Sequence, residues 1–267
     1  ELVVPRTTLW FNLEVAAQRY PDKAAYRFFG RALSFAQMRD QAIALAGWLQ
    51  SAGVGAGDRV AVFMQNCPQF ATACYAVWRA NAVVVPVNPM IRAEEFKHYI
   101  SDPQTRVVIC SADLAPIVHA ANDALPAAER VRHVLVARYS DALPDDAIEP
   151  GEAPSAAVEQ WLRGVPPLPA PAHAQSTPWA DALALAARPG PHTAQPDDLA
   201  MLPYTSGTTG LPKGCMHTHA TLMSNAVGAQ WGHAGPESVS LGVVPMFHIT
   251  GMMYSVLGSV YVGSTCV

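Results

Sequence analysis

Charged side chains are scarce in this sequence. Asp, Glu, Lys and Arg make up 14% of the 267 residues, whereas apolar residues make up 51%. The formal net charge is −4, and no run of Lys or Arg is long enough to form a basic field. Nucleic acid and anionic membranes are therefore not expected as partners, because both are bound through clustered positive charge. The composition predicts a globular protein with a deep core that acts on small molecules.

Cysteine is also infrequent, and no CxxC pair occurs. The five cysteines are Cys67, Cys74, Cys110, Cys215 and Cys266. An odd number without paired spacing predicts reduced, buried thiols rather than disulfides. Reduced thiols favour the cytoplasm, and the N-terminus around Pro5 and Arg6 lacks the apolar core of a signal peptide. We therefore expect a cytoplasmic protein.

No charged residue occurs from Ser238 to Val267. A run of this length could cross a membrane, but Pro245, Gly251 and Gly263 interrupt it. The pattern instead predicts a strand, a loop, a helix and a second strand, all buried. Because the sequence ends inside this run and does not begin with Met, we expect an interrupted domain.

Strand and helix patterns alternate along the first half of the sequence. Ser34 and Gln37 form a capping box before a helix predicted over 35–51, which ends at Gly53. Expected strands cover 59–64, 83–87, 106–110 and 133–137, and expected helices cover 68–80, 93–100 and 112–125, the last begun by Ser111. This alternation predicts an α/β fold with mainly parallel sheets covered by helices.

A proline-rich segment over 138–197 follows, with two short helices predicted over 156–162 and 179–187. The second is expected to have Thr177 as its N-cap and Pro178 as its first residue. A strand over 199–204, a loop over 205–216 and a helix over 218–230 come next. We expect two βα layers, with a first subdomain over 1–137, a connecting segment over 138–197 and a second subdomain over 198–267.

The loop from Tyr204 to Gly214 has the composition of a phosphate site. It holds three glycines, a lysine and four Ser or Thr hydroxyls directly after an apolar strand. Glycines let backbone N–H groups approach an anion, hydroxyls donate hydrogen bonds and Lys213 adds a positive charge. It is not a Walker loop, because Pro212 and Gly214 flank the lysine. The alternative is a surface loop without a ligand.

This loop resembles the phosphate-loop signature of adenylate-forming enzymes, the family of acyl-CoA synthetases, luciferases and peptide-synthetase adenylation domains. Gly57–Val60, Val83–Asn88 and Pro245–His248 extend the resemblance over most of the chain, although Asn81 stands where the family more often has Gly. The resemblance implies an incomplete N-terminal domain of the adenylate-forming fold. It also implies that ATP phosphates are bound by Thr205, Ser206, Gly207, Thr208, Thr209, Gly210 and Lys213.

A two-step reaction is implied by the same resemblance. A carboxylate attacks the α-phosphate of ATP to give acyl-AMP and Mg²⁺-pyrophosphate, and coenzyme A then displaces AMP. Carboxylic acid, ATP, Mg²⁺ and coenzyme A are thus the expected ligands. The family's groups for adenine, ribose and C-terminal-domain catalysis have no counterpart in this sequence. We therefore assign no certain catalytic residue and no metal ligand, and we expect the chain to be inactive alone.

The Pro245–His248 motif resembles the form found in acyl-CoA synthetases, which implies an acyl pocket lined by Phe247, His248, Gly251 and Met252. Peptide-synthetase domains usually carry Asp in place of His248 to hold an ammonium group, so an amino-acid substrate is not expected. The following apolar residues suit an aliphatic chain, but also plain helix packing. The leading prediction is a medium- or long-chain fatty acid-CoA ligase. The alternatives are an aromatic-acid-CoA ligase and a non-catalytic nucleotide-binding or interaction fragment, with homo-oligomer formation left open.

Two other patterns have simpler interpretations. Gly53, Gly55 and Gly57 follow a helix and precede a strand, the reverse of a dinucleotide fingerprint, so they are interpreted as a helix C-terminal turn. His217 and His219 have no third ligand nearby in the sequence. They are expected at the start of the helix that follows the phosphate loop rather than at a metal.

Overall fold

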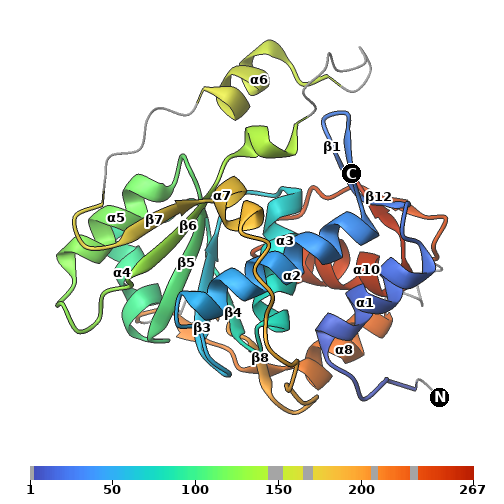
Figure 1. The fold of residues 1–267 in the computed structure, drawn as a ribbon, viewed down its shortest axis with the longest axis horizontal. Coiled ribbons are helices and arrows are strands. Elements are labelled where there is room, and N and C mark those ends of the chain that lie inside the picture. Colours follow the sequence, from blue (N-terminus) through green and yellow to red (C-terminus); the bar gives the residue numbers. More distant parts are fainter. Residues whose placement is uncertain (1–2, 144–152, 165–170, 206–209, 229–233) are drawn as a thin grey trace.

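The computed structural model describes residues 3–143, 153–164, 171–205, 210–228 and 234–267 (Figure 1). Its main sheet has seven strands in the order β11-β8-β4-β3-β5-β6-β7. All pairings are parallel except that of β11 with β8. The strands are β3 (Arg59–Phe63), β4 (Val83–Pro86), β5 (Thr105–Ser111), β6 (His133–Ala137), β7 (Gln175–Pro178), β8 (Leu199–Met201) and β11 (His217–Thr218). The expected α/β architecture with a mainly parallel sheet is confirmed.

Helices cover both faces of this sheet (Figure 1). Along β3, Val60 and Val62 belong to one buried cluster, whereas Ala61 and Phe63 belong to another. The first cluster includes side chains of α1, α2 and α3, and the second includes side chains of α4 and α5. These helices are α1 (Leu9–Arg19), α2 (Phe35–Ser51), α3 (Pro68–Arg79), α4 (Ala93–Ser101) and α5 (Ala115–Ala124). Burial on both faces explains why the strands read as continuous apolar runs.

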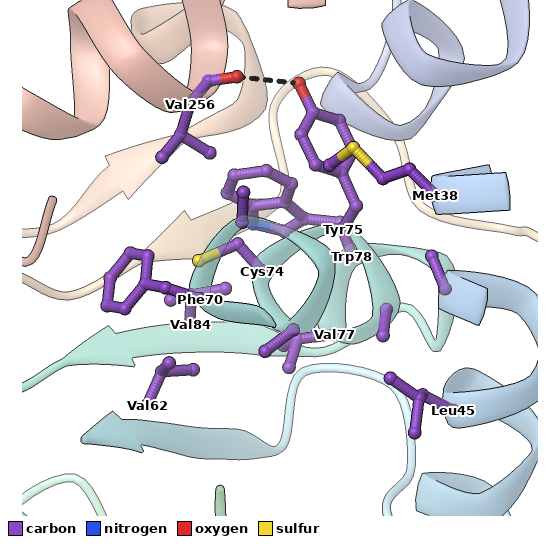
Figure 2. Close-up of a cluster of buried hydrophobic side chains, with 14 of the residues drawn as sticks. Met38, Leu45, Val62, Phe70, Cys74, Tyr75, Val77, Trp78, Val84 and Val256 are labelled. Carbon is purple, nitrogen blue, oxygen red and sulfur yellow. Dashed lines mark hydrogen bonds between the residues drawn. The ribbon is translucent and has the colours of Figure 1, made fainter. Parts of the chain in front are cut away.

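Helix α3 lies at the centre of the larger core, as Figure 2 shows. The ring N–H of Trp78 donates to the carbonyl of Ala200 at 2.9 Å. The hydroxyl of Tyr75 donates to the carbonyl of Val256 at 3.4 Å (Figure 2). Both rings are fully buried, so each polar atom needs a partner inside the protein. These bonds link α3 to segments that lie more than a hundred residues later in the chain.

A second sheet joins the two ends of the chain. Its four strands run in the order β12-β13-β1-β2, and Tyr26 pairs in parallel with Cys266. The strands are β1 (Ala24–Phe28), β2 (Arg31–Ser34), β12 (Val239–Ser240) and β13 (Thr265–Cys266). The β1–β2 hairpin turns at Phe29 and Gly30, whose φ angles of 43° and 83° suit a tight hairpin turn. In this sheet, strands from the range 1–137 pair with strands from the range 198–267. The division of the chain into two subdomains and a connecting segment stays a prediction.

The uncharged run from Ser238 to Val267 has the expected order of strand, loop, helix and strand. The helix consists of α9 (Ile249–Gly251), the π-helical η3 (Met252–Gly258) and α10 (Ser259–Val262). The prediction that the whole run is buried is wrong, because Val239, Leu241 and Val243 are 68%, 70% and 69% exposed. Val239 lies on β12, an edge strand of the four-stranded sheet, and Leu241 and Val243 lie in the loop that follows it. In the described ranges, no helix combines the length and the apolar character needed to cross a membrane.

Local expectations were met unevenly. The Ser34–Gln37 capping box begins α2 as predicted, and α6 (Ala156–Arg163) occupies its expected place. The expected helix after Ser111 begins later, because Ser111 is the last residue of β5 and α5 starts at Ala115. Thr177 is not an N-cap, since it lies in β7 and pairs with Leu135 of β6. Pro178 instead caps α7 (Trp179–Ala184).

The cysteines are all free, as predicted. Four of them are buried, and burial raises the pKa of the Cys67 thiol to about 12. Cys215 is only half-buried, which corrects the expectation that all five are enclosed. It directly follows the short strand β10 (Lys213–Gly214), and Lys213 at the start of that strand is exposed.

Asn81 occupies a position that requires a left-handed backbone. Its φ is 64°, in a region where Gly is favoured and Asn is the commonest substitute. Its side chain also accepts from the backbone N–H groups of Thr193 and Ala194 and donates to the carbonyl of Pro191. The departure from Gly at this position therefore adds an anchor for the proline-rich segment.

Candidate functional site

The predicted phosphate loop is built on a two-stranded hairpin. β9 (Tyr204–Thr205) pairs antiparallel with β10 (Lys213–Gly214), and the partner of Thr205 is Lys213. Both of these residues are exposed, as is Gly210. The fold thus places a hydroxyl and an ammonium group, eight positions apart in sequence, on adjacent strands. Ser206, Gly207, Thr208 and Thr209 lie outside the described residues.

The base of this hairpin packs on the last turn of α4. The ring of Tyr204 lies 4.8 Å from that of Tyr99 and 5.5 Å from that of His98, measured between centroids. The Tyr204 hydroxyl donates to Oδ2 of Asp102. Burial, together with the neighbouring Asp102 carboxylate, raises the pKa of Tyr204 far above its usual value. The phenol therefore remains protonated and acts as the donor.

Gly214 is required for this close packing. A Cβ atom at Gly214 would lie 3.2–3.4 Å from two ring carbons and the hydroxyl oxygen of Tyr204. Such contacts are tighter than ordinary van der Waals contact, so a side chain here would require the Tyr204 ring to shift. The glycine that closes the predicted motif thus has a packing role in addition to backbone flexibility.

The second candidate region is the segment from Leu241 to His248, which Asn66 anchors. The Asn66 amide donates to the carbonyls of Gly242 and Val244 at 2.8 and 2.9 Å. Its Oδ1 accepts from the N–H of Met246 at 2.7 Å. Asn66 follows β3 near the carboxyl end of the main sheet, so one side chain ties that sheet to the segment after β12.

The four predicted acyl-pocket residues fall into two groups. His248 is exposed and Phe247 is half-buried, whereas Gly251 and Met252 are buried. Nδ1 of His248 accepts from the N–H of Thr250 at 3.3 Å, so the ring caps α9. A Cβ atom at Gly251 would lie 2.1 Å from the carbonyl oxygen of Pro245, so this glycine allows close backbone contact. Their role as an acyl pocket stays a prediction.

An apolar cavity of about 420 Å³ lies beside this segment. Its lining includes Phe28 and Phe29 of the β1–β2 hairpin together with Asn66, Gly242 and Met246. None of the four predicted acyl-pocket residues lines it. This cavity was not predicted, because the β1–β2 hairpin was not among the expected elements.

The alternative patterns have structural explanations. Gly53 and Gly57 have φ angles of 86° and 76° and form the turn between α2 and β3, as predicted. His219 begins α8 (His219–Gly228) as predicted, and its Nδ1 accepts from the N–H of Leu9 at 3.2 Å. The same prediction is wrong for His217, which lies in β11 and pairs with Met201 of β8. Among the described residues, no group of three or more His, Cys, Asp or Glu side chains could hold a metal ion.

Comparison with known families shows which family this chain belongs to. The family described as AMP-binding enzyme matches residues 13–267, nearly the whole chain. The chain belongs to this family. The long-chain-fatty-acid–CoA ligase of Bacillus subtilis is 30% identical over 272 residues, which cover 94% of this chain and 44% of the relative. The chain therefore spans less than half the length of this family relative.

Solved structures support the fold of this family member. A long-chain-fatty-acid-CoA ligase from Archaeoglobus fulgidus matches with a TM-score of 0.75 and 22% identity, covering 100% of this chain and 47% of that one. An anthranilate CoA ligase in complex with anthranoyl-AMP matches with a TM-score of 0.71 and 21% identity, covering 100% and 45%. At these identities the likeness shows a shared fold.

Sequence reasoning missed three residues that shape the candidate site. Asp102 and His98 contact the base of the hairpin, and Asn66 holds the segment before His248. No local motif marks them, because each acts on a segment at least 100 residues away. The nearest signal is the position of Asn66 three residues after the end of a buried strand, where ligand-site residues of parallel sheets gather.

Proposed function

We propose that this chain is the phosphate-binding part of an acyl-CoA synthetase that activates a medium- or long-chain fatty acid. The observation that carries the proposal is the pairing of Thr205 with Lys213 across the hairpin. A hydroxyl donor and a cation on neighbouring strands suit adjacent oxygens of a polyphosphate. The fatty acid is favoured over other acids by the Bacillus subtilis relative and by the Phe247–His248 pair.

In the proposed reaction, an oxygen of the fatty-acid carboxylate forms a bond to the α-phosphorus of ATP. The bond from that phosphorus to the bridging oxygen of the β-phosphate breaks, and pyrophosphate leaves with two electrons of that bond. Negative charge grows on the departing pyrophosphate, so Thr205 and Lys213 would stabilise the group where charge develops. Mg²⁺ would arrive with the ATP phosphates and neutralise part of this charge.

The second step consumes the acyl-AMP. The thiolate of coenzyme A would attack the acyl carbon, form the thioester bond and release AMP, which is a better leaving group than the original carboxylate oxygen. We assign no catalytic residue to this step. For residues 1–267 alone we expect binding of phosphate ligands with little turnover, because positioning of the α-phosphate accounts for about 7–11 kcal/mol of such barriers.

A carboxylic-acid panel tests the substrate class. The test uses a longer polypeptide that includes residues 1–267 and has the full length of the relatives. It would be incubated with MgATP, coenzyme A and decanoate, hexadecanoate or benzoate. Mass spectrometry would then detect thioesters. The proposal expects decanoyl- or hexadecanoyl-CoA as the main product. Benzoyl-CoA as the main product would favour an aromatic-acid ligase, and ATP binding without any thioester would favour a non-catalytic nucleotide-binding protein.

A further inference from the structure

The C-terminal turn of α4 contacts β9 and the residue directly before β10 in the predicted phosphate-binding hairpin. Oδ2 of Asp102 accepts from the hydroxyl of Tyr204, the residue directly before Thr205. Nε2 of His98 lies 2.7 Å from the carbonyl oxygen of Pro212, the residue directly before Lys213. A carbonyl oxygen can only accept, so this ring nitrogen carries the proton and donates. Tyr204, which precedes Thr205, and Pro212, which precedes Lys213, are therefore both held by the same helical turn.

The hairpin needs such support. β9 and β10 contain two residues each and form a sheet of their own. An isolated two-stranded hairpin is at best marginally stable in water. By contrast, α4 is firmly anchored, because Phe96 and Ile100 are fully buried against the main sheet. The helix can therefore stabilise the arrangement of the two strands, whose own pairing spans only two residues each.

We propose that His98 and Asp102 are positioning residues that set the separation of Thr205 and Lys213 for a pyrophosphate group. This inference rests on the proposed function of the hairpin. Neither side chain is proposed to touch phosphate itself. His98 fixes the lysine-bearing strand and Asp102 fixes the threonine-bearing strand, while the ring of Tyr204 packs against that of His98.

Paired substitutions separate positioning from simple packing. His98→Phe keeps an aromatic ring against Tyr204 but removes the donor, whereas His98→Gln restores an N–H. Asp102→Leu removes the acceptor, whereas Asp102→Asn keeps an oxygen that can accept from Tyr204. Glu94→Gln, on an exposed side chain of the same helix, is the matched control. Tyr204→Phe completes a double-mutant cycle with Asp102→Leu.

Two measurements on the 267-residue protein give the readout. The first is calorimetric affinity for Mg²⁺-pyrophosphate, which we expect to fall about fivefold in His98→Phe and in Asp102→Leu, as for the loss of one hydrogen bond. The conservative variants and Glu94→Gln should stay within about twofold of the wild type, and Tyr204→Phe should add little to Asp102→Leu. The second is amide hydrogen exchange at residues 204–205 and 213–214, which should be faster in the two disruptive variants.

The two readouts distinguish this inference from the proposed function. If the wild-type protein does not bind Mg²⁺-pyrophosphate, the proposed function fails, and hydrogen exchange still decides whether α4 holds the hairpin. Unchanged exchange in both disruptive variants would overturn the inference. Unchanged pyrophosphate affinity in both variants, with wild-type binding intact, would overturn it as well.

Discussion

The backbone N–H of Met246 donates to Oδ1 of Asn66 at 2.7 Å, across a sequence separation of 180 residues. The other end of the same amide donates to two carbonyls of the same segment. One side chain therefore satisfies three backbone groups that precede Phe247 and His248. The position of the predicted acyl-pocket motif depends on a residue that follows a strand of the other sheet.

Asn66→Ala is expected to lower the free energy of unfolding by about 1–3 kcal/mol, because three backbone groups lose their partner in a partly buried site. Denaturant titration would measure this loss. The neighbouring Gln65 is exposed, so Gln65→Ala serves as the matched control and should change stability little. Equal stability of the two variants would show that the segment holds its place without the asparagine.

Gly251→Ala is expected to destabilise the protein by about 2–3 kcal/mol, because the added methyl group would overlap backbone atoms of Pro245 and Val244. Backbone atoms cannot move aside as the end of a flexible side chain can. Gly55→Ala is the control, since a Cβ there would meet only Oδ2 of Asp58 at 3.6 Å. A thermal melt that gives both variants the same midpoint would contradict the packing role of Gly251.

His219 should make stability depend on pH. Burial, the largest cause, together with the nearby His192, lowers the pKa of His219 from 6.5 to about 4. The unfolded chain therefore takes up a proton more readily than the folded protein. The contribution of neutral His219 to the free energy of unfolding is fully present above pH 6.5 and falls as the pH drops toward about 4. The total loss is about 3 kcal/mol.

His219→Asn tests this assignment, because Asn can still accept from the N–H of Leu9 but does not titrate in this range. Denaturant titrations at pH 7 and pH 4.5 should show a smaller loss of stability in this variant than in the wild type. The exposed His173 provides the control substitution, His173→Asn. An identical pH dependence in all three proteins would exclude His219 as its source.

The sequence predicted the main sheet well, because local patterns define its parts. The helix at 35–51 carries its own capping box, and the strands at 59–64 and 83–87 are apolar runs between clear helices. The second sheet could not be predicted in this way. Tyr26 pairs with Cys266, and no periodicity in either segment indicates a partner 240 positions away. Loop chemistry predicts Thr205 and Lys213 as phosphate contacts, but it does not indicate the α4 residues against which their hairpin packs.

Local signals also misled where a longer-range contact competed with them. Thr177 followed by Pro178 has the pattern of a helix start, yet this segment extends the main sheet beside β6. Ser111 could cap a helix, but it completes β5 and is fully buried. In both cases, the backbone N–H and C=O groups of the residue pair with a neighbouring strand, so the helix begins later in the chain.

Lys213→Ala provides the most direct test of a phosphate site on this hairpin. The lysine is assigned to the β- and γ-phosphates, and a hydrogen bond to a charged group contributes about 1.5–3 kcal/mol. Calorimetric titration of the wild-type and variant proteins with MgATP and with AMP would measure the effect. The account predicts at least about tenfold weaker ATP binding and unchanged AMP binding in the variant. Equal losses for the two nucleotides, or no loss for ATP, would contradict it.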